Sequence, residues 1–233
     1  ARRGRSRLGR RALGQLVDTR ERRRIVGDVT LTPMDFFLNR THPDTLVVAK
    51  SNFDSHGFTT HPLFFLRPPG REGLAVDVPL SCMLPKGIEG LLVTGLGVSA
   101  QRDAVPVIRM QPDIQNQGYA AGRAAAMAAR DGKPLRALDV KALQRHLIEI
   151  GVLPDRVLTD KDSLPLPAAA VREAVASFAR DGRTGLEVIL TQPDDARPML
   201  KAAYAKTEAV ESKLAVAHVL GMLGDATGVE TLA

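Results

Sequence analysis

The residues best suited to chemistry lie in one polar loop, between Ser51 and His61. Asp54 stands two positions before His56 in this loop. A carboxylate beside an imidazole can fix the imidazole tautomer, so we expect Asp54 and His56 to be a catalytic pair that moves a proton. The loop is also compatible with ordinary loop hydrogen bonding. A metal site is a third interpretation, but no third ligand follows at a suitable spacing, and we expect no metal.

A second set of candidate residues lies at the start of a helix made largely of glycine and alanine. We expect this helix to begin near Pro112 and to run towards Arg130. Arg109 and Asp113 flank its start. An arginine beside a helix amino end makes an anion site, because its charge adds to that of the free backbone N–H groups. A surface salt bridge explains Arg109 equally well.

The same helix carries small residues along one side. Gly118, Gly122 and Ala126 follow one another at intervals of four residues, which places them on one face. Each glycine costs roughly 1 kcal/mol of helix stability relative to alanine. We therefore expect something to approach this face closely, either a packed sheet or a cofactor.

Short strands and loops are expected to position these residues. Thr32 and Pro33 are typical of a helix start with proline at its first position. Residues 91–93 form a continuous apolar run between Gly90 and Gly95, which is typical of a strand buried on both faces. In all we expect strands at residues 29–31, 45–50, 76–84 and 91–93.

The chain becomes helical after the glycine-alanine helix. Asp139 and Gly151 are typical of the start and end of one further helix. Residues 154–167 are rich in proline and aspartate and are expected to form a linker between domains. Apolar faces beyond it predict helices at residues 168–179, 185–190, 196–205 and 209–223.

One internal repeat lies in this helical part. The sequence TGLE at Thr184 recurs as TGVE at Thr227, 43 positions later. That period lies within the roughly 40 to 47 residues of HEAT-type repeats. We therefore expect residues 168–233 to form a HEAT-like region that presents a surface to a protein partner.

Composition limits the classes of function. The chain has 233 residues with 44% hydrophobic and 25% charged content, which is ordinary for a soluble protein. No apolar run is long enough for a membrane span or a signal peptide, and the compartment stays unassigned.

Ten of the first 24 residues are arginines, and the remaining residues carry a net charge of −2. Because the positive charge is confined to this one segment, nucleic acid is not an expected partner. Both chain ends look cut, and we expect a fragment.

Several stretches together resemble FAD-dependent oxidoreductases with a Rossmann-type nucleotide-binding domain. Residues 19–32, TRERRRIVGDVTLT, resemble that family's R-E-x-R-R-I-x-G-D strand, and the sequence DSHG at Asp54 resembles its D-x-H-G loop. Residues 78–97, VPLSCMLPKGIEGLLVTGLG, are similar to its I-P-x-x-x-L-x-P-K-G-x-x-N-L-L-V-A-G-R segment. Residues 99–126 are similar to the segment that closes over the flavin.

This resemblance implies FAD as the cofactor and hydride transfer between the flavin and a substrate carbon. It places Arg20 and Arg23 on the substrate side, with Asp54 and His56. The glycine-rich segment that holds the ADP half of FAD in this family is absent from the chain. The remaining half of the cofactor site is implied at Gly95, Ser99, Arg109, Asp113, Gln117, Gly118, Ala121 and Gly122.

The chain departs from the family pattern in two places. Leu96 follows Gly95 where the family commonly has Gly-Arg. The pattern S-x-x-H-E-A is replaced by SAQRDA at Ser99, so that the stretch from Gln101 to Ala104 replaces a histidine and a glutamate. Either the substrate differs or this member has lost its activity.

The expected organisation has two parts. Residues 1–153 form the carboxy-terminal part of an α/β or α+β FAD-dependent oxidoreductase domain, with residues 1–18 as a flexible basic lead-in. Residues 154–167 are the linker, and residues 168–233 are the all-α repeat region. The expected function is hydride transfer between FAD and an unidentified small-molecule substrate. As a fragment, the chain is expected to be inactive without the missing amino-terminal FAD-binding segment. The alternative is a non-catalytic scaffold that uses the repeat surface.

Overall fold

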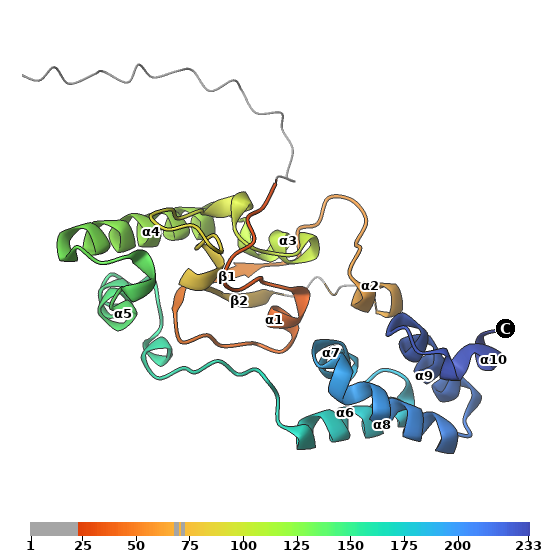
Figure 1. The fold of residues 1–233 in the computed structure, drawn as a ribbon. Coiled ribbons are helices and arrows are strands. Elements are labelled where there is room, and N and C mark those ends of the chain that lie inside the picture. Colours follow the sequence, from red (N-terminus) through yellow and green to blue (C-terminus); the bar gives the residue numbers. More distant parts are fainter. Residues whose placement is uncertain (1–22, 68–69, 71–72) are drawn as a thin grey trace, which may run out of the picture.

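A computed structural model describes residues 23–67, 70 and 73–233. Its centre is a small antiparallel sheet of β1 (Thr45–Ser51) and β2 (Leu74–Pro79), in which Val48 lies opposite Asp77. β1 was predicted at residues 45–50, and this prediction is confirmed. Helices surround the sheet, and Figure 1 shows α4 and α5 on one side of it and α6 to α10 on the other.

The first helix, α1 (Pro33–Phe37), begins at the predicted residues. The Thr32 hydroxyl accepts a hydrogen bond from the Met34 N–H at 3.2 Å. The Asp35 carboxylate accepts one from the Thr32 N–H at 2.6 Å. These two reciprocal bonds satisfy backbone N–H groups at the amino end of the short helix and form a capping box there.

The glycine-alanine helix is present as α4 (Gln111–Asp131), and it follows the single turn of α3 (Val105–Ile108). Gly132, with a φ of +61°, ends α4 in the left-handed conformation, which glycine adopts at little cost. The face of α4 that carries Gly118 and Gly122 is exposed. Apart from the adjacent residues and the nearby backbone of α4 itself, no atom of the described residues lies within 4 Å of a Cβ placed at either glycine. The group expected to approach them closely is therefore not among the described residues.

The prediction of a doubly buried strand at residues 91–93 is wrong. These residues form no strand, and the Leu91 side chain is 45% exposed. Their backbone has no neighbouring strand to pair with in the described part of the chain, and Val93 instead donates its N–H to the Met83 carbonyl at 2.9 Å. A short 3-10 turn, Gly95–Gly97, follows directly, with Gly95 at a φ of +66°.

Two other strand predictions also need correction. Residues 29–31 make only an isolated bridge, between Leu31 and Ala100, rather than a strand. The strand predicted at residues 76–84 stops at Pro79, because a 3-10 turn, Leu80–Cys82, begins there. The described part of this region thus contains a two-stranded antiparallel sheet in place of the larger sheet that an α/β domain requires.

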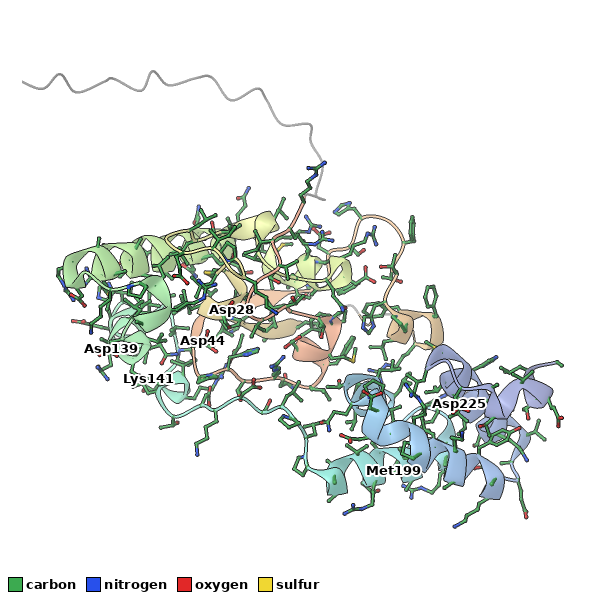
Figure 2. The ribbon with its side chains drawn as sticks, in the orientation of Figure 1. Asp28, Asp44, Asp139, Lys141, Met199 and Asp225 are labelled. Atoms are coloured by element: carbon green, nitrogen blue, oxygen red, sulfur yellow. The ribbon has the colours of Figure 1, made fainter. Side chains whose placement is uncertain are left out.

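The helix that follows α4, α5, is hydrogen-bonded to the segments on either side of it in space. α5 (Val140–Glu149) begins after Asp139, which caps it by accepting from the Ala142 N–H. Lys141, labelled in Figure 2, donates to the carbonyls of Pro43 and Val157 at 3.0 and 2.7 Å. These bonds join α5, the turn before β1 and the segment that follows α5.

Salt bridges fasten residues 154–167 as well. This segment contains the 3-10 turn Asp155–Leu158 and otherwise has no regular structure. Arg156 pairs with Asp77 of β2 at 2.6 Å, and Arg40 pairs with Asp162 at 2.8 Å. The segment predicted to be a linker therefore lies along the surface of the part that precedes it.

Helices make up the rest of the chain, as predicted for residues 168–233. One side of this region contacts the sheet-containing part, because α7 lies against α1 and α2. Arg67, at the end of α2, pairs with Glu187 of α7 at 3.5 Å. The remaining helices are α2 (Pro62–Leu66), α6 (Ala168–Asp181), α7 (Leu186–Thr191), α8 (Pro193–Lys206), α9 (Val210–Met222) and α10 (Val229–Leu232).

The two copies of the repeated sequence pack alike. A Cβ placed on Gly185 would lie 2.7 Å from the backbone of Ala174, in α6. A Cβ placed on Gly228 would lie 2.6 Å from the Cβ of Ala217, in α9. In each copy, the absence of a side chain at the glycine lets the turn after a helix pack closely against an alanine of that helix. The alanine lies 11 positions before the glycine in both copies.

Candidate functional site

Asp54 and His56, which were predicted to be a catalytic pair, are in contact. His56 Nε2 lies 2.9 Å from Asp54 Oδ1. The other carboxylate oxygen of Asp54 lies 3.2 Å from the Arg109 guanidinium, which also donates to the Asp54 carbonyl. Both members of the pair are about half exposed, with 51% of the His56 side chain and 47% of the Asp54 side chain accessible. A small molecule can therefore reach the imidazole.

Arg109 links this loop to the start of α4. It lies between α3 and α4, and its side chain is 9% exposed. The guanidinium is a fixed positive charge, and its contact with Asp54 holds the loop over the α3–α4 corner. The structure thus brings together two groups of residues that the sequence places in separate clusters.

Asp113, in the first turn of α4, joins this helix to the end of β1. Its carboxylate accepts a hydrogen bond from the Lys50 N–H at 3.3 Å. Only 7% of the residue is exposed. Burial raises the pKa of Asp113, and the Lys50 backbone and ammonium groups offset only part of this rise.

Gln117 is completely buried and bridges two segments. Its side-chain oxygen accepts from the Gly95 N–H at 2.9 Å, and its side-chain nitrogen donates to the Ile108 carbonyl at 2.9 Å. This amide fixes the Gly95 turn against the α3–α4 corner. Gln117 and Gly95 were both predicted at the cofactor site, and the structure places them in direct contact.

The other predicted cofactor residues have varied surroundings. The Ser99 hydroxyl is hydrogen-bonded to the Thr30 hydroxyl at 2.8 Å, and Ser99 is 1% exposed. Ala121 is buried in α4, whereas Gly118 and Gly122 are exposed on its open face. The site residues therefore divide into an inner set that shapes the corner and an outer set that faces solvent.

A small pocket is lined in part by His56. Its volume is about 30 Å³, enough for about two water molecules. Three arginines and one carboxylate contribute to its wall, next to an apolar edge. The lining residues are Arg24, Ser55, His56, Arg102, Asp103, Val105, Pro106 and Arg109.

Arg24 and Arg102 were missed as site residues by sequence reasoning. The resemblance singled out Arg20 and Arg23. Arg20 lies outside the described residues, and Arg23 is exposed and is not among the lining residues of the pocket. The available signals were the second arginine of the R-R pair in the family motif and the arginine that takes the place of the motif histidine at Arg102.

A larger cavity of about 640 Å³ is lined in part by Asp54. It reaches from the end of β1 and the start of β2 to Met110, which directly precedes α4. The Ser51 hydroxyl, on its wall, is buried and has no hydrogen-bond partner in the described part of the chain. This volume is in the range of small-molecule and cofactor sites.

His61 has a local structural role. Its Nδ1 accepts a hydrogen bond from the Leu63 N–H at 3.2 Å and so caps α2. Burial lowers the pKa of His61, and the Asp103 carboxylate offsets this only in part. Among the described residues, no group of three or more His, Cys, Asp or Glu side chains is arranged to hold a metal ion. In the same part of the chain, no helix is long and apolar enough to cross a membrane.

Comparison with known proteins identifies the family. Residues 4–147, more than half of the chain, match the sequence model of the FAD dependent oxidoreductases. The chain belongs to this family, and its cofactor is FAD. No curated protein and no solved structure matches the chain.

The residues at the α3–α4 corner fit such a cofactor. The backbone of α4 is open at Gly118 and Gly122, where an added Cβ would meet no atom within 4 Å outside the adjacent residues and the helix backbone, so a bound group could approach it closely there. The Ser51 hydroxyl in the larger cavity has a hydrogen bond still to make. The amino end of α4, which follows Met110 on the wall of the larger cavity, favours negative charge on a bound group.

Proposed function

We propose that this protein catalyses hydride transfer between an organic small molecule and FAD, with Asp54 and His56 moving the accompanying proton. The observation that carries the proposal is the 2.9 Å contact between these two side chains, fastened by Arg109 to the amino end of α4. Bound FAD supplies the hydride acceptor or donor. The residues of the chain supply orientation and proton transfer.

The direction of the contact assigns roles to the imidazole nitrogens. Because His56 Nε2 faces Asp54, the carboxylate accepts the Nε2–H, and Nδ1 carries the free lone pair. During substrate oxidation, a C–H bond breaks and its electron pair leaves with the hydrogen. The proton of the neighbouring O–H or N–H group passes to His56 Nδ1, and a C=O or C=N bond forms. The reverse reaction returns the proton from the same nitrogen.

We also propose which residues hold the cofactor. Gly118 and Gly122 would allow the close approach, and the amino end of α4 beside Asp113 would stabilise negative charge on the flavin ring. Gln117 acts indirectly by fixing the turn at Gly95. The chain has no G-x-G-x-x-G sequence after a strand, which supports the proposal that another segment of the protein holds the ADP half of FAD.

The test compares two histidine variants of the full-length protein loaded with FAD. Neutral and carboxylate-bearing alcohols and amines are screened for anaerobic reduction of the flavin, and the best substrate is kept. His56→Asn is expected to slow flavin reduction by about 10²- to 10⁴-fold with an unchanged FAD content. His218→Asn, at an exposed position of α9, is the matched control. Equal rates in the two variants would contradict the role of His56.

A second candidate function rests on the paired glycine-alanine contacts. Gly185 against Ala174 and Gly228 against Ala217 support a tandem HEAT-like repeat in residues 168–233. The alternative to catalysis is a scaffold that binds another protein through this surface. It predicts that none of the screened substrates reduces the flavin of the full-length protein, so the same screen distinguishes the two functions.

A further inference from the structure

The two copies of the repeated sequence differ in what covers them. Because the copies are 43 positions apart, α6 corresponds to α9, and α7 corresponds to α10. α6 packs against α7, α8 and α9, whereas α9 packs against α6, α8 and α10. Among the described residues, no helix follows α10 to take the places beside α9 that α8 and α9 take beside α6.

One face of α9 is open as a result. In α6, three positions at helical spacing form a buried face: Val171, Val175 and Phe178. Their counterparts in α9 are all exposed: Leu214, His218 and Gly221. Leu214, for example, is 37% exposed, whereas Val171 is completely buried.

The short helix α10 shows the same difference. Leu186 and Ile189 of α7 are buried, but their counterparts in α10, Val229 and Leu232, are 55% and 40% exposed. Leu232 Cδ1 lies 3.7 Å from the place of a Cβ on Gly221, so the open faces of α9 and α10 are continuous. The last repeat of a tandem array has a polar outer face in soluble proteins. The apolar face of α9 and α10 is instead typical of an internal repeat.

The first copy shows what kind of helix covers such a face. α8 lies against α6 and buries Ala196 and Leu200, which are four positions apart. A small and a large apolar residue at this spacing form one stripe along a helix. Gly221 stands where α6 has Phe178, and beyond the adjacent residues and the helix backbone only Leu232 lies near the place of its Cβ. The second copy therefore leaves room for a large apolar side chain from the covering helix.

We propose that the open face of α9 and α10 is covered by a further copy of the repeat in the full-length protein, with helices that pack on α9 as α8 and α9 pack on α6. The connection between helices supports this occupant. α7 ends at Thr191 and α8 begins at Pro193, so a helix that follows α10 reaches the open face over an equally short connection. This inference rests on the paired packing of the two copies and does not depend on the hydride transfer.

Single cysteines report whether the face is covered. Leu214→Cys places a thiol on the open face. Val210→Cys is the matched control, because it lies on the same helix, is 79% exposed, and has an exposed counterpart, Pro167, in the first copy. The native Cys82 is fully buried, and burial raises the pKa of its thiol, so its reaction does not interfere.

The rate of alkylation by iodoacetamide is measured for both variants in the 233-residue chain and in the full-length protein. Peptide mass spectrometry identifies the alkylated position. Leu214→Cys is expected to react about tenfold or more slowly in the full-length protein than in the 233-residue chain, because a packed helix must first open. Val210→Cys should react at the same rate in both.

A second measurement supplies the occupant directly. A copy of residues 191–233 is joined after Ala233, which continues the 43-residue register through a second set of α8, α9 and α10. This extension should protect Leu214→Cys from alkylation as the full-length protein does. The same extension with aspartate in place of the residues copied from Ala196 and Leu200 should not protect it, because a carboxylate is costly to bury in an apolar contact.

Three results would overturn the proposal. The first is equal reactivity of Leu214→Cys in the 233-residue chain and in the full-length protein, which would show that the face stays open. The second is protection that increases with protein concentration, which would assign the face to a second copy of the chain. The third is equal reactivity of Leu214→Cys in the two extended chains, which would show that a further repeat does not fit the face.

Discussion

At the scale of single residues, Asp103 lies in the wall of the small pocket beside His56 and is bonded to the end of the loop that carries Asp54 and His56. Its carboxylate receives the N–H groups of Thr60 and His61 and faces Arg102. A buried carboxylate with several donors is stabilising as long as all of its partners are present. Asp103 therefore positions the end of the loop.

Replacing this carboxylate with an amide gives the first prediction. Asp103→Asn keeps one acceptor oxygen but loses the charge and places an N–H₂ group against backbone donors. The free energy of unfolding is expected to fall by about 1–3 kcal/mol, measured by urea denaturation. Glu208→Gln, at an exposed position, makes the same chemical change and should have little effect. Equal stability of the two variants would contradict the role given to Asp103.

The cap of α2 gives a prediction about pH. The pKa of His61 is lowered in the folded protein, mainly by burial, so the unfolded chain binds a proton more readily. Stability should therefore be complete above about pH 6.5, the ordinary pKa of histidine, and should fall as the pH decreases below it. The physical reason is that burial disfavours the charged imidazolium. A proton on Nδ1 also removes the acceptor of the Leu63 N–H.

The measurement compares the stability of the unaltered protein and His61→Asn between about pH 8 and 5. Asparagine can accept the same hydrogen bond without titrating. The variant should lose less stability on acidification than the unaltered protein does. Parallel stability curves for the two proteins would show that the cap does not titrate.

Residues close in sequence were easier to foresee than those brought together by folding. Asp54 and His56 are separated by one residue, and a loop of that length allows their contact whatever the fold. Arg24 and Arg102 meet only because the segment before α1 bonds to the backbone between Gly97 and Gln101. No local pattern in the sequence reveals such long-range pairing.

At the scale of secondary structure, α4 was predicted almost to the residue because its signals are local. Pro112 stands in its first turn and Gly132 follows its last residue, and both act through their own backbone conformations. The run at residues 91–93 failed as a strand for the opposite reason. A strand needs a partner, and none of the described segments supplies one.

The open face of α4 gives a prediction with two opposing effects. The methyl groups added by Gly118→Ala and Gly122→Ala meet no atom within 4 Å beyond the adjacent residues and the helix backbone, so each change should stabilise the protein without FAD by about 0.5–1 kcal/mol. The same changes should weaken FAD binding, because the added methyl group blocks close approach to the backbone. Thermal unfolding and FAD titration measure the two effects.

A third glycine serves as a control for α4. Gly132→Ala should destabilise the protein, because Gly132 has a φ of +61° and an alanine there is strained. If Gly118→Ala and Gly122→Ala bind FAD as tightly as the unaltered protein, the open face of α4 is not the surface that the cofactor approaches.

At the scale of the whole molecule, the helical part is joined to the sheet-containing part at several points. Arg156 and Arg40 tie residues 154–167 to the sheet side, and α7 lies against α1 and α2. Figure 1 shows the helical part beside α2 and below the sheet. Proline and aspartate predicted an irregular segment here, but the partners of its charges lie far away in the sequence and were not foreseeable.

The repeated glycine gives a prediction for this helical part. Gly228→Ala places a methyl group 2.6 Å from the Ala217 Cβ, although the φ of −96° at Gly228 suits any residue. Overpacking of this kind should lower the stability by about 1–3 kcal/mol, measured by thermal unfolding. Gly221→Ala, on the same helix as Ala217 and with only an ordinary contact at 3.7 Å, should cause no such loss.

The equivalent change in the first copy tests whether the two copies are alike. Gly185→Ala should be at least as harmful, because it combines the clash with Ala174 and a φ of +92°. Unchanged stability of either variant would contradict the repeated packing.

The central proposal is that His56, oriented by Asp54, moves the proton when FAD and an organic substrate exchange a hydride. The most direct measurement is the rate of anaerobic flavin reduction in the FAD-loaded, full-length protein, compared between His56→Asn and His218→Asn. The account predicts a rate about 10²- to 10⁴-fold lower in His56→Asn and an unchanged rate in His218→Asn. Equal rates in the two variants would contradict it.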